Sequence, residues 1–128
     1  MNLEPTPSSP AVTKTPADAL RLPNCPHPQA RLTRPRVNQV FQGQIQARGT
    51  ASIETFDYYK FEIRREDGKA EDEWHWLNSF ETPVEDGPLG TLSVEGLPNG
   101  IYTLRLTVVN REGNYPFAPC DVRIRIRR

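Results

Sequence analysis

The sequence predicts an all-β protein: a seven-stranded antiparallel β-sandwich that follows a disordered amino-terminal tail. From Ala30 onward, apolar residues recur at every second position, which is the period of a strand with one buried face. No comparable helical period appears. Gly, Asp, Asn and Pro recur between these segments as turn signals, at a spacing of about ten residues. With 128 residues, the chain is long enough for one domain with its own core.

The first 23 residues are predicted to be a linker. They are rich in Pro, Thr, Ser and Ala, and no Gly occurs in the first 35 residues. Few large apolar side chains are present, so folding would bury too little surface to offset the loss of conformational entropy. We expect residues 1–23 to be disordered or polyproline-like and residues 24–128 to form the sandwich. Such a linker can tether a domain to a membrane anchor or to other domains of a longer protein. The alternative is a frayed terminus without a role.

Seven segments of the domain are predicted as strands. Pro35 marks the first as an edge strand, because proline cannot donate to a hydrogen-bond ladder. Gly43 and Gly49 indicate bends or a close backbone approach in the second. Turns are expected at residues 66–69, 85–88, 98–100 and 111–114, where Gly is combined with Asp, Asn or Glu. The seven segments are residues 30–37, 40–51, 56–66, 73–80, 90–97, 102–108 and 120–128.

The last segment alternates most strictly. Three apolar residues, Val122, Ile124 and Ile126, occupy one face, and arginines 123, 125 and 127 occupy the other. An arginine ladder can indicate an anion site, but this alternation is typical of a solvated sheet face, and we adopt that interpretation. In this topology the first strand can run parallel beside the last.

A tyrosine corner is expected where the segment "LPNGIYTLRLTVV" begins. Tyr102 starts the penultimate strand just after a loop that contains Leu97. In β-sandwiches a tyrosine at this place bonds back to the main chain a few residues upstream. The hydroxyl group of Tyr102 is therefore predicted to bond to the backbone near Leu97, with Gly100 allowing the sharp turn.

The two cysteines enclose almost the whole predicted domain. Cys25 lies where the linker ends and Cys120 begins the last strand. Their spacing excludes a zinc ribbon or a Cys-x-x-Cys redox pair. We predict a disulfide, which would place the protein outside the cytoplasm, with two buried reduced thiols as the alternative.

Several motifs together resemble a known family. They are "GTAS" from Gly49, "FDYYKFEI" from Phe56, "PVEDGPLGTL" from Pro83, "LPNGIYTLRLTVVNREGNY" from Leu97 and "GNYPFAPC" from Gly113. This combination resembles fibronectin type III and immunoglobulin-like modules of bacterial cell-envelope proteins, which are sometimes appended to penicillin-binding or other cell-wall proteins. The resemblance covers residues 25–128. It implies a non-catalytic, extracytoplasmic spacer or protein-interaction module with no catalytic residues and no cofactor.

Charge and composition argue against several functions. Sixteen basic and sixteen acidic side chains cancel, which disfavours nucleic acid as a partner. No apolar run is long enough to insert into a membrane. No nucleophile motif surrounds Ser52, Ser79 or Ser93, and the two histidines have no motif around them, so we expect no enzyme activity. The acidic stretch of residues 66–73 lacks the spacing of a calcium loop and is interpreted as a solvated hairpin tip.

A pair of tryptophans suggests a second function. Trp74 and Trp76 share one face of a predicted strand, where exposed aromatic rings can stack on sugars or anchor a protein partner. The alternative for at least one of them is burial in the core. Together with Tyr58, they are the predicted ligand contacts of a carbohydrate- or cell-wall-binding module.

Overall fold

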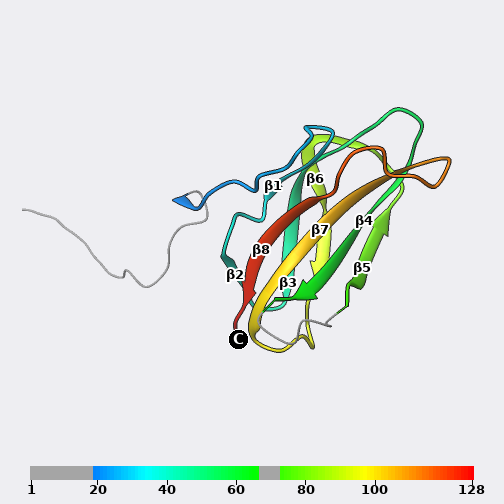
Figure 1. Cartoon of the computed structure of the whole chain (residues 1–128). Helices are drawn as coiled ribbons and strands as arrows, with labels where there is room; N and C mark the ends of the chain where they lie inside the picture. The colour runs from blue at the N-terminus through cyan, green and yellow to red at the C-terminus, as the bar shows by residue number, and fades with distance from the viewer. Residues whose placement is uncertain (1–18, 67–72) are drawn as a thin grey trace, which may run out of the picture.

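The residues that the structure describes form eight β-strands. The computed structural model describes residues 19–66 and 73–128, and no α-helix occurs in these two ranges. Figure 1 shows the strands arranged in two layers, one behind the other. The strands are β1 (Ala30–Arg34), β2 (Gln39–Phe41), β3 (Gln44–Ala51), β4 (Phe56–Arg65), β5 (His75–Phe80), β6 (Val84–Ser93), β7 (Gly100–Asn110) and β8 (Cys120–Ile126).

The two layers are separate sheets. One has three strands in the order β1-β3-β6, and the other has five in the order β2-β8-β7-β4-β5. All pairs are antiparallel except β2 and β8, which run parallel. The all-β, two-sheet architecture agrees with the prediction from the sequence.

The structure departs from the predicted seven antiparallel strands in two respects. The segment predicted as one strand over residues 40–51 divides into β2 and β3 at Gln42 and Gly43, which gives an eighth strand. The two halves belong to different sheets, because β2 pairs with β8 and β3 pairs with β1 and β6. The parallel β2–β8 pair makes the five-stranded sheet mixed.

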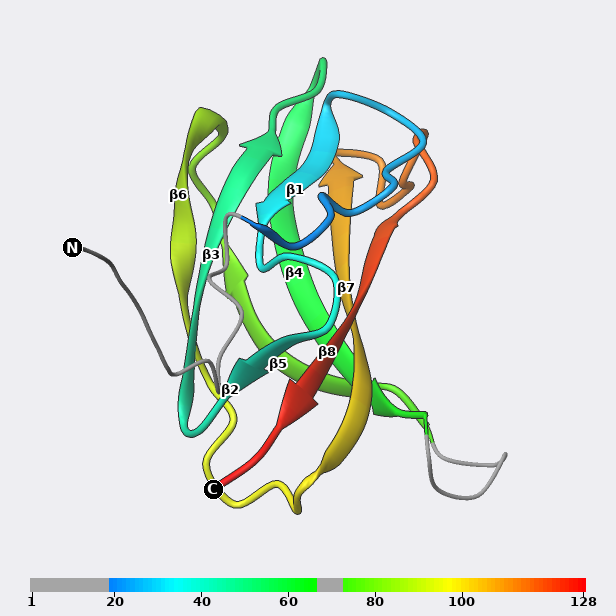
Figure 2. The same cartoon turned by 90° about the vertical axis from the view of Figure 1, so that its left-hand side faces the viewer.

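The chain also changes sheet between β1 and β2 (Figure 2). A cis peptide bond joins Arg34 to Pro35 at the end of β1. Residues of the predicted linker lie against this connection. The N–H of Val37 donates to the carbonyl of Arg21 at 2.9 Å, and Arg36 Nη1 donates to the carbonyl of Leu20 at 3.0 Å. The part of the linker that the structure describes is therefore bonded to the domain, and the remainder, residues 1–18, lies outside the described residues.

The backbone of β3 is irregular beside both of its neighbours. At Gly49, β3 closely approaches β1, since a Cβ atom there would lie 2.0 Å from the carbonyl oxygen of Arg31. Residues 85–88, predicted as a turn, instead belong to β6. Gly87 pairs with Gly49, and Asp86 has a positive φ of 49° in a bulge beside them. The bulge explains the error, because it needs the same small and turn-forming residues as a loop.

The core lies between the two sheets, and its buried strand residues come from β1, β3, β4, β6, β7 and β8. The aromatic rings pack together, with Tyr59 stacked on Phe80 at 5.3 Å and meeting Phe61 edge-on at 6.0 Å between centroids. Burial of each large apolar side chain contributes about 1.5–3 kcal/mol to stability. The largest completely buried side chains are those of Phe61, Leu32, Ile45, Ile63, Leu89, Leu92, Leu104, Leu106, Ile124 and Ile126.

Candidate functional site

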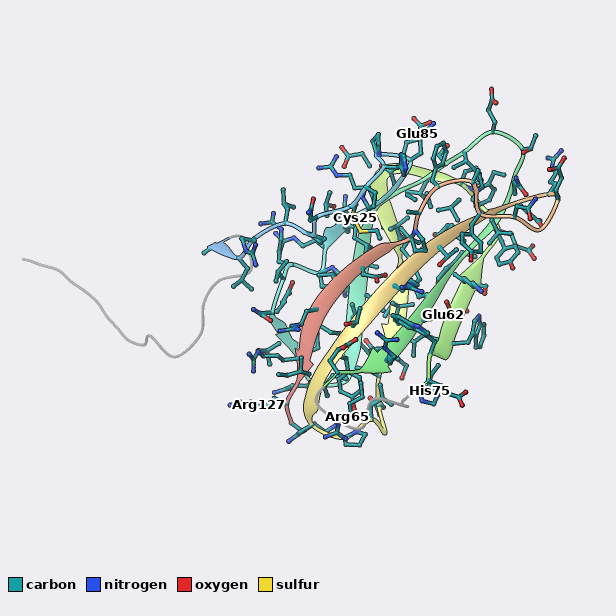
Figure 3. All side chains as sticks on the ribbon, viewed as in Figure 1. Cys25, Glu62, Arg65, His75, Glu85 and Arg127 are labelled. Carbon is teal, nitrogen blue, oxygen red and sulfur yellow. A yellow bond between two sulfur atoms is a disulfide. The ribbon has the colours of Figure 1, made fainter. Side chains whose placement is uncertain are left out.

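A disulfide bond joins Cys25, which precedes β1, to Cys120, the first residue of β8 (Figure 3). The two Cα atoms lie 4.8 Å apart although 95 positions separate the cysteines in the chain. Cys120 is completely buried, and the N–H of Leu32 donates to Cys25 Sγ at 3.2 Å. The predicted bond is therefore present, in place of the alternative of two reduced thiols.

Tyr102 lies at the start of β7 with its ring buried. Its hydroxyl group donates to the carbonyl oxygen of Pro98 at 2.7 Å. The acceptor is thus the residue after Leu97, whose own carbonyl accepts a bond from the guanidinium group of Arg128. Both bonds hold the loop before β7 against the domain, and Leu97 packs against the core.

Trp74 lies immediately before β5, on the outer face of the five-stranded sheet. Two guanidinium groups contact its ring: that of Arg105 lies 4.1 Å from the centroid and that of Arg64 lies 4.6 Å from it. The arginines come from β7 and β4, so the indole is held across two neighbouring strands. Trp74 is half-buried by these contacts on the outer face and lies outside the core. Its ring is therefore engaged by cations of the same chain.

Arg105 is fixed by a second interaction. Its Nε and Nη2 atoms donate to the two carboxylate oxygens of Asp121 on β8, at 2.8 and 3.0 Å. This hydrogen bonding, with the charges of Asp121 and Glu62, raises the pKa of Arg105, while partial burial acts in the opposite direction. The guanidinium therefore stays charged and contacts Trp74 and Asp121 at the same time.

Trp76 is the exposed member of the pair. Its side chain is 61% exposed, and its indole N–H donates to Ser79 Oγ at 2.7 Å. It lies opposite Glu62 of β4, whose place on the same outer face is visible in Figure 3. Tyr58, half-buried, lies four residues from Glu62, which is about 13 Å along the strand. The structure thus brings the two tryptophans to one end of the face and leaves Tyr58 at a distance.

Sequence reasoning missed the residues that surround the tryptophans, which include Arg64, Arg105 and Asp121. The alternation of residues 56–66 and 102–108 places Arg64 and Arg105 at outward positions. Their meeting at one indole, however, depends on which strands are neighbours, and that information is absent from local periodicity.

Other candidate chemistry finds little support in the described residues. In residues 19–66 and 73–128, no group of three or more His, Cys, Asp or Glu side chains is arranged to hold a metal ion. The calcium alternative falls mostly on residues outside the described ranges. Glu66, which is described, accepts a bond from Thr103 Oγ1 at 2.6 Å. The hollows lined by described residues include two open ones of about 480 and 500 Å³. The first lies beside Ser52, whose hydroxyl is 3.4 Å from Glu85.

Comparison with known proteins identifies no relative. No family model matches the chain, and neither does any curated protein or solved structure. In the ranges that the structure describes, no helix is long and apolar enough to cross a membrane.

Proposed function

We propose that the chain is a non-catalytic, immunoglobulin-like module of an extracytoplasmic bacterial envelope protein, acting as a spacer or a protein-interaction domain. The Cys25–Cys120 disulfide carries the proposal. Disulfides persist in oxidising compartments and are rare in the cytoplasm. The resemblance of the corner and turn motifs to envelope modules supports the bacterial assignment.

Two details of the fold support the immunoglobulin or fibronectin type III type. The hydroxyl group of Tyr102 bonds to the backbone four residues upstream, as in the tyrosine corner of such sandwiches. The first two strands lie in different sheets, with β1 in one and β2 beside β8 in the other. Neither detail involves chemistry at a substrate, which fits a structural role.

The disulfide has a mechanical consequence for a spacer. When the two ends of the chain are pulled, tension passes from Cys25 directly to Cys120 through the sulfur atoms. Residues 26–119 lie inside the covalent loop and carry none of this tension. The bond therefore prevents residues 26–119 from lengthening under load, and only the residues outside the loop extend.

Force spectroscopy on the whole chain, held by handles at both ends, tests the spacer role. In the oxidised protein the loop residues contribute no length on unfolding. Reduction releases roughly 300 Å of additional chain, because 95 positions separate the cysteines. Equal lengthening of the oxidised and reduced chains would contradict the proposal. Two free thiols in protein recovered from its own cells and alkylated at once would contradict the extracytoplasmic assignment.

Trp76 favours a second candidate function, a carbohydrate- or cell-wall-binding module. Its ring is exposed, and the bond to Ser79 holds it against the outer face of the sheet. A fixed, exposed indole is a suitable platform for a sugar ring, since little side-chain entropy is lost on binding. Trp74 contributes less, because Arg64 and Arg105 already contact its ring.

Titration with soluble peptidoglycan fragments, followed by tryptophan fluorescence, tests this candidate. Binding is expected to change the emission of the natural chain and to be lost in Trp76→Ala. Val40→Ala is the control, because Val40 is 50% exposed and lies on β2, at the opposite edge of the five-stranded sheet from β5. A spectrum that no fragment alters would exclude the glycan function.

A further inference from the structure

Three arginines form a ladder on the outer face of β8. Arg123, Arg125 and Arg127 alternate with Val122, Ile124 and Ile126, which are buried. Alternate residues of a strand lie about 6.6 Å apart, so the guanidinium groups follow one line along the sheet. Figure 3 shows Arg127 where β8 ends, close to the carboxyl terminus.

Within residues 19–66 and 73–128, the ladder differs from the other arginines of the same face in having no acidic partner. Arg64 contacts Glu66 at 3.4 Å, and Arg105 is bonded to Asp121. Among residues 19–66 and 73–128, by contrast, no ion pair or side-chain hydrogen bond involves Arg123, Arg125 or Arg127. A solvated face explains the alternation of the arginines. It does not explain why the described residues supply acidic partners to the arginines of β4 and β7 and none to those of β8.

A hollow at the end of the sandwich collects part of this charge. It has a volume of about 500 Å³ and is lined by Asn99, Gly100, Ile101, Arg125, Ile126 and Arg127. No acidic side chain is among these residues. The side-chain oxygen of Asn99 accepts the N–H of Arg128 at 3.1 Å, which leaves its amide N–H2 group as a donor. Two arginines and one asparagine, residues whose side chains can donate hydrogen bonds to an anion, therefore line the same hollow.

We propose that this hollow binds a phosphate group of an anionic ligand, with Arg125 and Arg127 as its principal contacts and Arg123 extending the site along β8. The neighbouring Arg105–Asp121 pair explains the choice of phosphate. There, one guanidinium group occupies both oxygens of a carboxylate. A site with two such groups and an amide matches an anion with more acceptor oxygens, which a phosphate group provides.

The test is a titration of the whole ¹⁵N-labelled chain with tripolyphosphate at low ionic strength, observed through the arginine Nε–H and asparagine amide signals. Saturable shifts are expected for Arg125, Arg127 and Asn99. In Arg125→Gln/Arg127→Gln, the Kd is expected to rise about tenfold or more, because each guanidinium makes charge-assisted hydrogen bonds to the ligand.

The matched control is Arg31→Gln/Arg48→Gln. Both of these arginines are exposed on the other sheet, and the substitution removes the same charge. It is expected to change the Kd by less than about twofold, because distant exposed charges are screened. If Arg125→Gln/Arg127→Gln does not fold, Arg127→Gln alone replaces it. Arg127 is exposed and lies beyond β8, so this single substitution is expected to weaken binding without changing the melting temperature.

Three results would overturn the proposal. The first is an equal loss of affinity in Arg125→Gln/Arg127→Gln and in the control variant, which would indicate non-specific attraction. The second is tighter binding of citrate than of tripolyphosphate, which would assign the hollow to carboxylates. The third is the absence of saturable shifts in the natural chain.

Discussion

The hydroxyl group of Tyr59, on β4, donates a hydrogen bond of 2.5 Å to the carbonyl oxygen of Leu89, on β6. This bond connects the two sheets through the core. Leu89 is the additional residue of a bulge, since Gly90 pairs with Ala47 and Pro88 pairs with Arg48. Its carbonyl lies outside the paired positions of the ladder, and the tyrosine satisfies it where water is excluded.

We predict that Tyr59→Phe lowers the free energy of unfolding by about 1–3 kcal/mol, because a buried carbonyl is left without its partner. The ring remains, so packing against Phe61 and Phe80 is preserved. Chemical denaturation, with the midpoint and slope fitted together, measures the change. Tyr115→Phe serves as the control at an exposed position, and an equal effect in both variants would contradict the cross-sheet role.

The same tyrosine predicts a dependence of stability on alkaline pH. Burial raises the pKa of Tyr59 above its ordinary value of 10.0. The folded state therefore holds this proton more tightly than the unfolded state, so the contribution is complete below pH 10 and is lost as the pH rises through the folded-state pKa. The free energy of unfolding of the natural chain is expected to fall more steeply above pH 10 than that of Tyr59→Phe. Parallel curves would exclude this linkage.

Local alternation of apolar and polar residues predicts which side chains of a strand are buried, but it does not predict which sheet the strand joins. Period-two patterns place residues such as Tyr59, Leu104 and Ile124 on the inward faces of their strands, and these residues are buried. Alternation continues from Phe41 to Ile45, however, although the chain changes sheet between them. A buried face looks the same whichever sheet supplies it, and Gly43 was the only local signal of the break.

The candidate site was predictable to a smaller extent. Trp74 and Trp76 are two positions apart on a predicted strand, so their spacing already predicts that they share one face. The contacts of Trp74 with Arg64 and Arg105 depend on the pairing of β4 with β5 and β7. A bulge opposite Phe61 and Glu62 shifts the register of β4 and β5. Long-range pairing of this kind is set by the whole core, so no local stretch of sequence contains it.

Gly49 is predicted to tolerate no side chain. In Gly49→Ala, the added Cβ would lie 2.0 Å from the carbonyl oxygen of Arg31, so β1 and β3 would have to separate. We expect a loss of at least about 3 kcal/mol, and a failure to fold is consistent with it. Gly113→Ala is the control, because that glycine has a positive φ but open space around it, and its cost is about 1 kcal/mol. A melting temperature that falls equally in both variants would contradict the close approach.

Removal of the disulfide is predicted to destabilise the domain by about 4–5 kcal/mol, as expected for a closed loop on the order of a hundred residues. Cys25→Ala/Cys120→Ala and the reduced natural chain should have similar midpoints of denaturation, both below that of the oxidised chain. The variant should not respond to reductant. A reduced chain, with both thiols verified by mass, that melts at the temperature of the oxidised chain would contradict the role of the bond.

The contact of Arg105 with Trp74 is predicted to control the environment of the indole. The chain contains two tryptophans, so Trp76→Phe leaves Trp74 as the only reporter. In that background, Arg105→Met removes the nearer cation and the partner of Asp121. We expect stronger quenching of Trp74 by acrylamide and a loss of about 0.5–2 kcal/mol in stability.

Arg123→Met is the matched control for this substitution. It removes the same charge from the same sheet face, but no contact joins Arg123 to either tryptophan in the described part of the chain. Its quenching should equal that of the Trp76→Phe background. If both methionine variants expose Trp74 equally, the effect belongs to the charge of the whole face. A difference confined to Arg105→Met means that the Asp121–Arg105–Trp74 contacts hold the indole in place, so a ligand that stacks on this ring must first displace a paired arginine.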